Sequence, residues 1–448
     1  MGYCIWKSYK LKKGAFELFE NLKPERGNFL FDSSLNQDKE LGRHSIIGSQ
    51  PFHILKGNGF GVLDKLGVLL DKFKVKQGPL PFCGGAAGYL AYDTGNNIAR
   101  FYFGFYNKAL IFDHITGRMH LYSCGAPETK SSLSKKLAKE NFRYLTDLLS
   151  GLISGKNTVA VAADKKIRLK SNFSRTAYLK AVKKAKEYIR NGDIYQVNLS
   201  QQFSGCTDMS AVQIYRRLRK ESPSYFSAFF DAGEFQIISS SPERFLKVEN
   251  SQVSTRPMKG TRPRCGRALR DGLLRQQLLR SEKDKAELLM IVDLERNDLG
   301  RVCDYNSVKV SSLRQLEEYN TVFQATATVE GRLHKNFDRI DLIRASFPGG
   351  SVTGCPKLRS MEIIKELEKT GRGIYTGSLG FLSFCGKMDM NILIRTILKK
   401  GRKVYFGCGG GIIADSRPQA EYSETLIKAK AIVRSLGGGF RYGRKSVF

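Results

Sequence analysis

Two acidic pairs in the second half of the chain have the residue types and spacing to bind a cation. Asp284 and Glu287 lie three residues apart on one expected helix, and Glu421 and Glu424 lie three apart on another. Each pair therefore projects from one helical face. Four carboxylates facing one another would favour Mg²⁺ over zinc, since no imidazole or thiolate accompanies them. Acidic pairs of this kind also occur on solvated helix faces, and Glu424 could instead pair with Lys428 at i+4.

Two glycine-rich segments could bind an anion through backbone N–H groups. Gly407-Cys-Gly-Gly-Gly-Ile412 follows an expected strand and precedes the second acidic helix, and Phe347-Pro-Gly-Gly-Ser-Val-Thr-Gly-Cys-Pro-Lys357 opens another helix. Such loops bind carboxylates or phosphates, although the first segment could equally be a tight turn. Arg395, expected on a strand after Asp389, could hold a carboxylate with its planar fork. Together these parts describe a site for a substrate with two carboxylates, one of them neutralised by Mg²⁺.

Hydropathy patterns predict the elements that position these residues. Residues 1 to about 125 are expected to form short strands and turns, followed by a helix through Leu149 and a domain boundary near 150–170. Thr176 to Arg190 has the spacing of an amphipathic helix that ends at Asn191-Gly192. The remaining predictions are helices over 284–299, 357–369 and 418–435, and strands over 194–203, 235–240, 377–384, 391–398 and 403–408.

Composition excludes several classes of protein. A chain of 448 residues with 41% hydrophobic and 26% charged residues is ordinary for a globular protein of two or three domains. No apolar run approaches the roughly 18 residues that a membrane span needs. The start, MGYCIWKSYKLKKG, has no apolar region of a signal peptide, so a cytoplasmic protein is expected.

The net charge of +32 is unusual, because 74 Lys and Arg stand against 42 Asp and Glu. Such a charge could attract nucleic acid. The basic residues are scattered in pairs, however, without a long block or interleaved aromatic residues, which favours a solvated surface over a nucleic-acid partner. The nine cysteines include no CxxC and the five histidines have no metal-ligand spacing, so reduced, mostly buried thiols are expected.

Five ordered segments resemble the chorismate-utilising enzymes: Asp193-Ile-Tyr-Gln-Val-Asn-Leu-Ser200, Ser241-Pro-Glu-Arg-Phe245, Met290-Ile-Val-Asp-Leu-Glu-Arg-Asn-Asp298, Gly377-Ser-Leu-Gly-Phe381 and Gly409-Gly-Gly-Ile-Ile-Ala-Asp-Ser416. The likeness is strong over about 170–435 and extends weakly into the first module. It implies an α/β (α+β) fold in which large antiparallel sheets form a sandwich flanked by helices. It also implies an N-terminal domain over 1–150, a chorismate-binding catalytic domain over 168–436 and a basic tail over 437–448.

Lys259 is the residue that divides this family. The resemblance implies that water-using members have a lysine base where this chain has Gln196, so hydration is not expected. Among the aminating branches, anthranilate synthase component I has Ala in its Pro-x-Ala-Gly-Thr segment and aminodeoxychorismate synthase component I has Lys, and this chain reads Arg256-Pro-Met-Lys-Gly-Thr261. The resemblance therefore favours amination of chorismate at C4, for 4-aminobenzoate and folate synthesis. Anthranilate formation and a catalytically inactive basic RNA-binding protein are the alternatives.

The resemblance implies a catalytic role for two residues. As a neutral amine, Lys259 would attack C2 of the ring while the C4 hydroxyl leaves, and ammonia would then enter at C4. We expect burial and nearby cations, such as Arg256, Arg262 or the metal, to depress its pKa. Glu243 would protonate the leaving hydroxyl, which requires a raised pKa. The other interpretation of Glu243 is an ion pair with Arg244.

The remaining site residues are also implied by the resemblance. Glu287 and Glu424 would bind Mg²⁺ directly, with Asp284 and Glu421 behind them through water. Gln324 stands where family members usually have His. The groups implied to bind chorismate are Gln196, Tyr375, Arg395, the amides of Gly409, Gly410 and Gly411, and Lys428.

A glutaminase motif is not found after residue 436. The resemblance therefore implies that ammonia comes from a separate glutamine amidotransferase subunit, component II.

Overall fold

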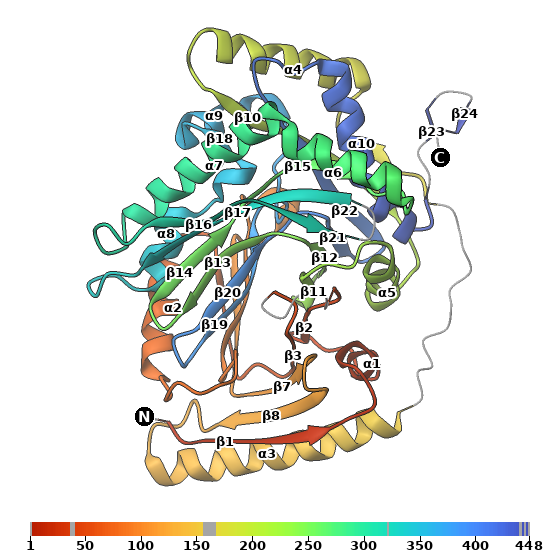
Figure 1. The fold of residues 1–448 in the computed structure, drawn as a ribbon. Coiled ribbons are helices and arrows are strands. Elements are labelled where there is room, and N and C mark those ends of the chain that lie inside the picture. Colours follow the sequence, from red (N-terminus) through yellow and green to blue (C-terminus); the bar gives the residue numbers. More distant parts are fainter. Residues whose placement is uncertain are drawn as a thin grey trace.

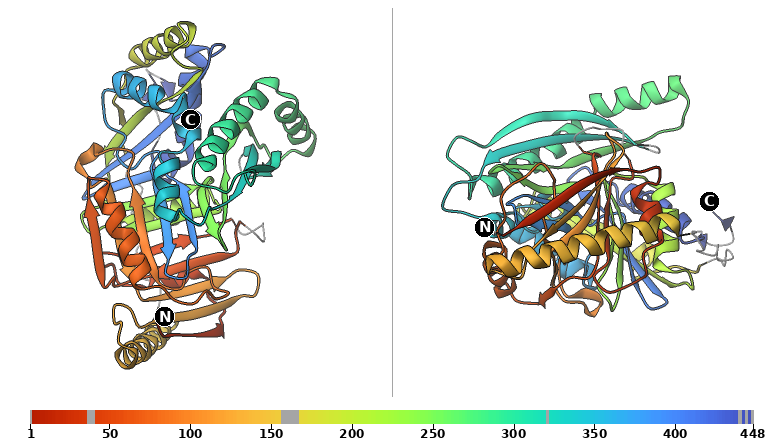
Figure 2. Two further views of the ribbon diagram at one scale, coloured as in Figure 1. Left: turned by 90° about the vertical axis from the view of Figure 1, so that its left-hand side faces the viewer. Right: turned by 90° about the horizontal axis from the view of Figure 1, so that it is seen from below.

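The computed structural model describes residues 2–35, 41–155, 167–319 and 322–438, with the backbone of 441–442 and 445–446. Two large antiparallel sheets lie face to face, and helices cover their outer sides (Figures 1 and 2). The predicted fold class, an α+β sandwich with flanking helices, is confirmed.

The first sheet has twelve strands. In spatial order they are β1 (Cys4–Lys10), β8 (Arg118–Cys124), β7 (Lys108–Asp113), β3 (His44–Gly48), β2 (Phe29–Asp32), β11 (Phe226–Asp231), β12 (Gln236–Ser241), β21 (Thr396–Lys400), β22 (Lys403–Ile412), β10 (Gln196–Cys206) and β18 (Gly354–Cys355), with β9 (Lys170–Ser171) beside β10.

The second sheet has ten strands. Their order is β15 (Met258–Pro263), β17 (Val322–Arg332), β14 (Gln252–Arg256), β13 (Arg244–Glu249), β20 (Met388–Ile392), β19 (Ser378–Ser383), β5 (Gly85–Leu90), β6 (Phe101–Tyr106) and β4 (His53–Gly57), with β16 (Lys309–Glu318) beside β17. A separate short hairpin pairs β23 (Arg441–Tyr442) with β24 (Lys445–Ser446).

The main core fills the space between the sheets. Phe29 of the first sheet packs edge-to-face on Tyr106 of the second, and Phe230 packs in the same way on Tyr89. All four rings are fully buried, and each such side chain contributes roughly 1.5–3 kcal/mol of hydrophobic free energy. This packing fixes how the two sheets face each other.

Helices complete the layers on both outer sides. Those against the first sheet are α1 (Ala15–Glu20), α3 (Ser131–Ser154), α4 (Arg175–Arg190), α5 (Ala211–Glu221), α9 (Lys357–Glu368) and α10 (Pro418–Ser435). Those beside the second sheet are α2 (Gly61–Lys72), α6 (Ala268–Arg280), α7 (Glu282–Gly300) and α8 (Arg339–Ser346), and 3₁₀ turns lie at Gly95–Asn97 and Gly350–Val352.

The N-terminal segment contributes strands to both sheets. In the first sheet β2 pairs with β11, and in the second β5 pairs with β19. The predicted boundary near 150–170 falls between α3 and β9, where residues 156–166 lie outside the described part. Because strands before this boundary pair with strands after it, the predicted division of the chain at 150–168 does not separate the sheets. Half of the predicted tail, 437–448, also lies outside the described residues.

The predicted helices match the structure closely. The expected helices over 176–190, 284–299, 357–369 and 418–435 correspond to α4, α7, α9 and α10. In α4 the apolar residues predicted to face inward, among them Tyr178 and Val182, are buried, and the Ser174 hydroxyl caps the N-terminus by accepting from Ala177 N–H. Helices α1 and α2, inside the segment expected to hold only strands and turns, were not predicted.

The single strand predicted over 391–398 is wrong, because the chain changes sheets there. Strand β20 ends at Ile392 in the second sheet, and β21 begins at Thr396 in the first. Arg395, at the crossover, has a φ of +50°, in the left-handed region. Apolar residues on both sides of Arg395 and Thr396 concealed this break.

The segment Gly409–Gly411 is part of strand β22, which corrects the prediction of a loop or tight turn. Gly409, Gly410 and Gly411 pair with Ser200, Leu199 and Asn198 of β10. Beyond Tyr405 the opposite edge of β22 is not paired by β21. Backbone groups on that edge are therefore available for other contacts.

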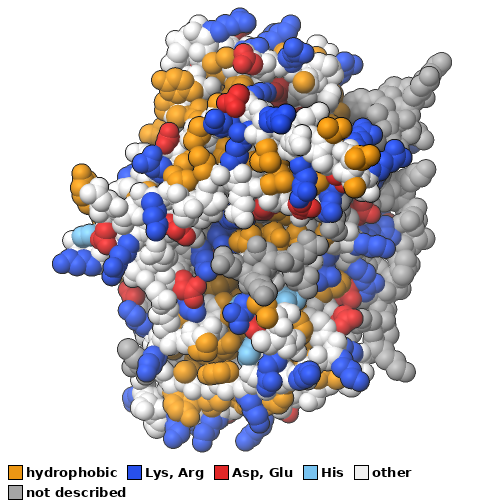
Figure 3. All heavy atoms as spheres, viewed as in Figure 1, with side chains coloured by type: hydrophobic (Ala, Val, Ile, Leu, Met, Phe, Trp, Pro, Cys, Tyr) orange, Lys and Arg blue, Asp and Glu red, His pale blue; other side chains and the backbone are white. Residues whose placement is uncertain are grey.

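The described part of the chain contains no helix that is both long and apolar enough to cross a membrane. Lys and Arg side chains are spread over the face shown in Figure 3 rather than gathered in one stripe. The scattered basic pairs seen in the sequence are thus also scattered in space on this face.

Candidate functional site

The candidate site lies where edge strand β15 of the second sheet meets β22 of the first, beside α7 and α10 (Figure 1). Lys259, on β15, reaches β22, and a Cβ built on Gly411 would lie 3.2 Å from Lys259 Nζ. The same Cβ would lie 2.8 Å from Nε2 of Gln196. Glycine at 411 therefore leaves space that these two side chains share.

Burial lowers the pKa of Lys259 from its usual value near 10.5. The charges that act on it next come from Glu287, which raises its pKa, and from Lys428, which lowers it. A lysine in these surroundings is easier to deprotonate than one in water. The expected depression is present, and burial, as predicted, is its largest cause. The cation that lowers the pKa is Lys428 rather than the predicted arginines, because Arg256 pairs with Glu317 and Arg262 donates to Asp284 at 2.7 Å.

Glu243 is buried beside Lys259, with 3% of its surface exposed. Burial raises its pKa to about 7, although Ser351, Lys259 and the N–H of Met258 favour the charged form. It does not pair with Arg244, whose guanidinium binds Asp389 through two hydrogen bonds of 3.0 and 2.9 Å. Glu243 therefore meets the expected requirement of a raised pKa.

Gln196 and the β22 glycines form the floor of the site. Both amide atoms of the Gln196 side chain are buried without a hydrogen-bond partner in the described structure. Lys428 Nζ donates to the Gly409 carbonyl at 3.0 Å, and the Gly409 N–H faces the Tyr375 hydroxyl. Because buried polar groups are nearly always paired, the free amide of Gln196 points to a polar ligand.

Tyr375 and Arg395 lie at the side of this floor. The Tyr375 ring fills the space where a Cβ at Gly407 would stand. Burial lowers the pKa of Arg395, and no ion pair of Arg395 occurs within the described residues. The Tyr319 ring centroid lies 6.0 Å from its guanidinium, and Tyr319, Cys408 and Glu243 act on its charge. A buried guanidinium without a carboxylate partner is suited to an anionic ligand.

The four predicted metal ligands line two helices that face the site. A Cβ on Gly410 would lie 3.4 Å from carboxylate oxygens of both Glu421 and Glu424. Burial raises the pKa of Glu421 and of Glu287, and the charge of Glu424 raises both further. Asp284 lies on the Glu287 helix and is bound by Arg262.

These carboxylates do not form a preassembled metal site. No group of three or more His, Cys, Asp or Glu residues is placed to hold a metal within the described ranges. Glu424 forms the alternative ion pair with Lys428, at 2.7 Å, and Lys283 lies 3.8 Å from Glu287. The oxygen donors still suit Mg²⁺ in type, and their mutual repulsion would favour a cation between them.

Two residues near the site were not predicted. Ser351 lies in the glycine-rich loop 347–357, and its buried side chain faces Glu243, whose charged form it stabilises. Lys283 precedes Asp284 on α7, and its charge acts on Glu287, Glu421 and Glu424. The loop was a signal for Ser351, whereas nothing in the sequence separated Lys283 from the other basic residues.

Gln324, which stands where the family usually has His, lies on β17 next to β15. Its Nε2 donates to the Thr261 hydroxyl at 3.4 Å, and its Oε1 is buried without a partner in the described part. Gln324 is therefore a neighbour of the Lys259 strand.

The chain is similar to known proteins over most of its length. The family described as "chorismate binding enzyme" matches residues 53–434. Aminodeoxychorismate synthase component 1 of Bacillus subtilis is 34% identical and covers 96% of both chains, and anthranilate synthase component 1 of Aquifex aeolicus is 37% identical over 79% of this chain and 74% of its own. The crystal structure of anthranilate synthase component I from Streptococcus pneumoniae superposes with a TM-score of 0.77 at 33% identity, covering 87% of this chain and 92% of the other.

Glu243→Gln should flatten the pH dependence of stability. The carboxyl pKa rises from 4.5 to about 7 on folding, so the stability that the protonated form provides is complete below about pH 4.5 and is lost as the pH rises through 7. Between pH 5 and pH 8 the free energy of unfolding of the wild type should therefore fall by about 2–3 kcal/mol more than that of the variant. Urea unfolding at both pH values measures this difference.

Glu282→Gln is the matched control, since that side chain is 79% exposed, and it should follow the wild type. Parallel pH profiles for wild type and Glu243→Gln would contradict the raised pKa.

Proposed function

The chain belongs to the chorismate binding enzymes, and we propose that it is a C4-aminating member, equivalent to aminodeoxychorismate synthase component 1. It then replaces the C4 hydroxyl of chorismate with an amino group and gives 4-amino-4-deoxychorismate, used for 4-aminobenzoate and folate. Relatives named for C4 amination and for anthranilate synthesis have similar identity. The observation that carries the choice is the side chain of Lys259, placed within the site beside Glu243.

Lys259 and Glu243 have complementary protonation tendencies. Burial favours the neutral amine of Lys259 and the neutral acid of Glu243. The amine can bond to C2 while the ring double bonds shift and the C4–O bond breaks, and Glu243 gives its proton to the departing hydroxyl, which leaves as water. Ammonia then bonds to C4, the double bonds shift back and the Lys259 nitrogen leaves C2.

The substrate carboxylates are assigned to the basic and amide groups of the floor. Arg395 has the planar fork that binds a carboxylate through two parallel hydrogen bonds. The second carboxylate can accept hydrogen bonds from Tyr375, from the open backbone edge at Gly409–Gly411 and from Lys428. The free amide of Gln196 can orient the ring substituents. The buried guanidinium without a partner is the main support for this assignment.

For Mg²⁺ we propose Glu287 and Glu424 as direct ligands, with Asp284 and Glu421 acting through water. All four donors are hard carboxylate oxygens. Burial raises the pKa of Glu287 and Glu421, and the nearby charge of Glu424 raises both further. When bound, the ion would supply positive charge opposite a substrate carboxylate. It would also replace the ammonium groups of Lys283 and Lys428 as partners of these glutamates.

The ammonia is proposed to come from a separate glutamine amidotransferase subunit. Several relatives are named "component 1", which agrees with a second component. Anthranilate synthesis is the second candidate, favoured by relatives of that name and by the Streptococcus pneumoniae structure.

The product formed from chorismate, Mg²⁺ and ammonium separates the two candidates. C4 amination leaves the enolpyruvyl group in place, so we expect no pyruvate and a product that an added lyase converts to 4-aminobenzoate. Lys259→Ala should lower the rate of this reaction by at least about a hundredfold, as expected when a nucleophile is removed. Mass spectrometry of the product and a pyruvate assay make the measurement.

Lys285→Ala is the matched control, because that lysine is exposed on the outer side of α7. Release of pyruvate with fluorescent anthranilate would overturn C4 amination, and full activity of Lys259→Ala would overturn the covalent route.

Arg395→Lys should raise the KM for chorismate about tenfold or more, because an ammonium cannot reproduce the two parallel hydrogen bonds of the guanidinium. The kcat should change less than the KM. Steady-state kinetics at saturating ammonium test this, with Arg402→Lys, 73% exposed in the β21–β22 turn, as control. An unchanged KM would remove Arg395 from the binding site.

Mg²⁺ alone should raise the thermal midpoint of the wild type by about 1–2 °C at a concentration well above its Kd, through preferential binding to the folded state. Glu287→Gln should abolish the shift, whereas Glu282→Gln should keep it. Differential scanning calorimetry at constant ionic strength makes the comparison, and an equal shift in Glu287→Gln would refute this ligand.

A further inference from the structure

Two cysteines outside the proposed site lie beside each other at one end of the second sheet. Ser383 ends β19 opposite Gly85, the first residue of β5, and Phe384 N–H donates to the Gly84 carbonyl at 3.0 Å. Cys83 lies two residues before β5 and Cys385 lies two residues after β19, in the turn to β20, and the two thiols are hydrogen-bonded to each other. Neighbouring thiols can close to a disulfide where their Cα atoms are roughly 4.4–6.8 Å apart.

The Ser383 hydroxyl holds the two cysteine residues together. It accepts from Cys83 N–H at 2.8 Å, donates to the Gly84 carbonyl at 2.9 Å and lies 3.2 Å from Cys385 Sγ. Cys83 and Cys385 are 3% and 7% exposed. Their side chains are thus positioned by a shared contact inside the fold rather than by chance on the surface.

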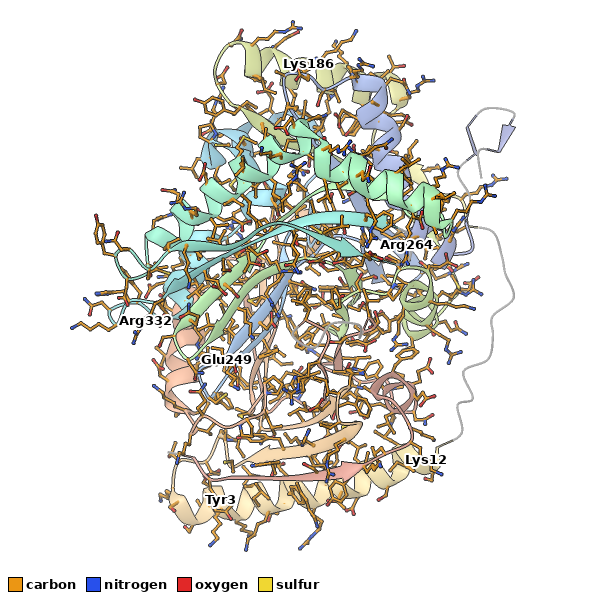
Figure 4. All side chains as sticks on the ribbon, viewed as in Figure 1. Tyr3, Lys12, Lys186, Glu249, Arg264 and Arg332 are labelled. Carbon is orange, nitrogen blue, oxygen red and sulfur yellow. The ribbon has the colours of Figure 1, made fainter. Side chains whose placement is uncertain are left out.

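A cavity of about 290 Å³ reaches Cys385, one member of this pair. Its wall includes Cys385, Lys74 and Arg339, and it adjoins the end of β13 near Glu249, labelled in Figure 4. Arg339 donates to the carbonyls of Ser383 and Lys387, at 2.7 and 3.0 Å, and so spans the turn that carries Cys385. A small solute of the size of hydrogen peroxide can be accommodated there.

The surroundings make Cys385 the more acidic of the two thiols. Contact with Cys83 lowers the pKa of Cys385 most, followed by Ser383, the Lys387 N–H and the Lys387 charge, against the effect of burial. The same contact, together with burial, raises the pKa of Cys83. A thiolate near cationic groups is the form that reacts with peroxides.

We propose that Cys83 and Cys385 are a redox-active pair that closes to a disulfide when a peroxide enters this cavity. The Cys385 thiolate attacks one peroxide oxygen, the O–O bond breaks, and a sulfenic acid forms with release of one water after proton uptake. The Cys83 sulfur then attacks the Cys385 sulfur and expels a second water. Two thiols and one hydrogen peroxide thus give one disulfide and two waters, and a dithiol reductant reverses the reaction.

The test uses the full reduced chain, treated with a few equivalents of hydrogen peroxide at pH 7, alkylated under denaturing conditions and mapped by mass spectrometry. We expect a peptide pair joined through Cys83 and Cys385, lighter by two hydrogens and separated again by dithiothreitol. The link should form at least about tenfold faster than oxidation of the buried Cys124. This inference is independent of the proposed function.

Two variants resolve the order of steps. In Cys83→Ala, dimedone should trap a sulfenic acid at Cys385, whereas in Cys385→Ala, Cys83 should remain a thiol. Cys206→Ala, which removes an exposed cysteine, should leave the link unchanged. The wild-type map does not depend on how well the variants fold.

Two results would overturn the proposal. One is a link between Cys4 and Cys124, which are also opposite each other in the β1–β8 pairing. The other is oxidation confined to the exposed Cys206 and Cys265, with Cys83 and Cys385 recovered as alkylated thiols.

Discussion

The site depends on the exclusion of solvent from one amine, Lys259, and one carboxylic acid, Glu243, at the junction of the two sheets. Lys259 approaches from the second sheet and the β22 glycines from the first, so the junction exists only while the aromatic core holds the sheets together. Burial penalises the ammonium of Lys259 and the carboxylate of Glu243 alike. The chemistry proposed for both residues uses their neutral forms, which this environment favours.

The positive charges of the site are arranged around that neutral pair. Lys428 is held by Glu424 and the Gly409 carbonyl, whereas Arg395 has no carboxylate partner among the described residues. Lys283 lies between the acidic helices. The high net charge of the chain is thus separate from the local balance of the site, where acidic and basic groups are closely matched.

The sequence predicted the local elements well and their connections less well. The acidic pairs on α7 and α10 follow from helical periodicity, which depends on nearby residues only. The crossover at Arg395 was missed because apolar residues flank it on both sides. The strand at Gly409–Gly411 was missed because glycine favours turns. Burial was correctly predicted to lower the pKa of Lys259, but the contributing cation was misassigned, since the partners of Arg256 and Arg262 come from distant segments.

Both halves of the chain contribute strands to both sheets, so neither half can be removed without leaving the sheets incomplete. A fragment lacking residues 1–150 would leave β11 without β2 and β19 without β5, and would expose two interior strands as new edges. Unprotected edges of this kind promote association between molecules. The segment recognisable in the sequence therefore lacks strands of both sheets, and only the N-terminal strands complete them.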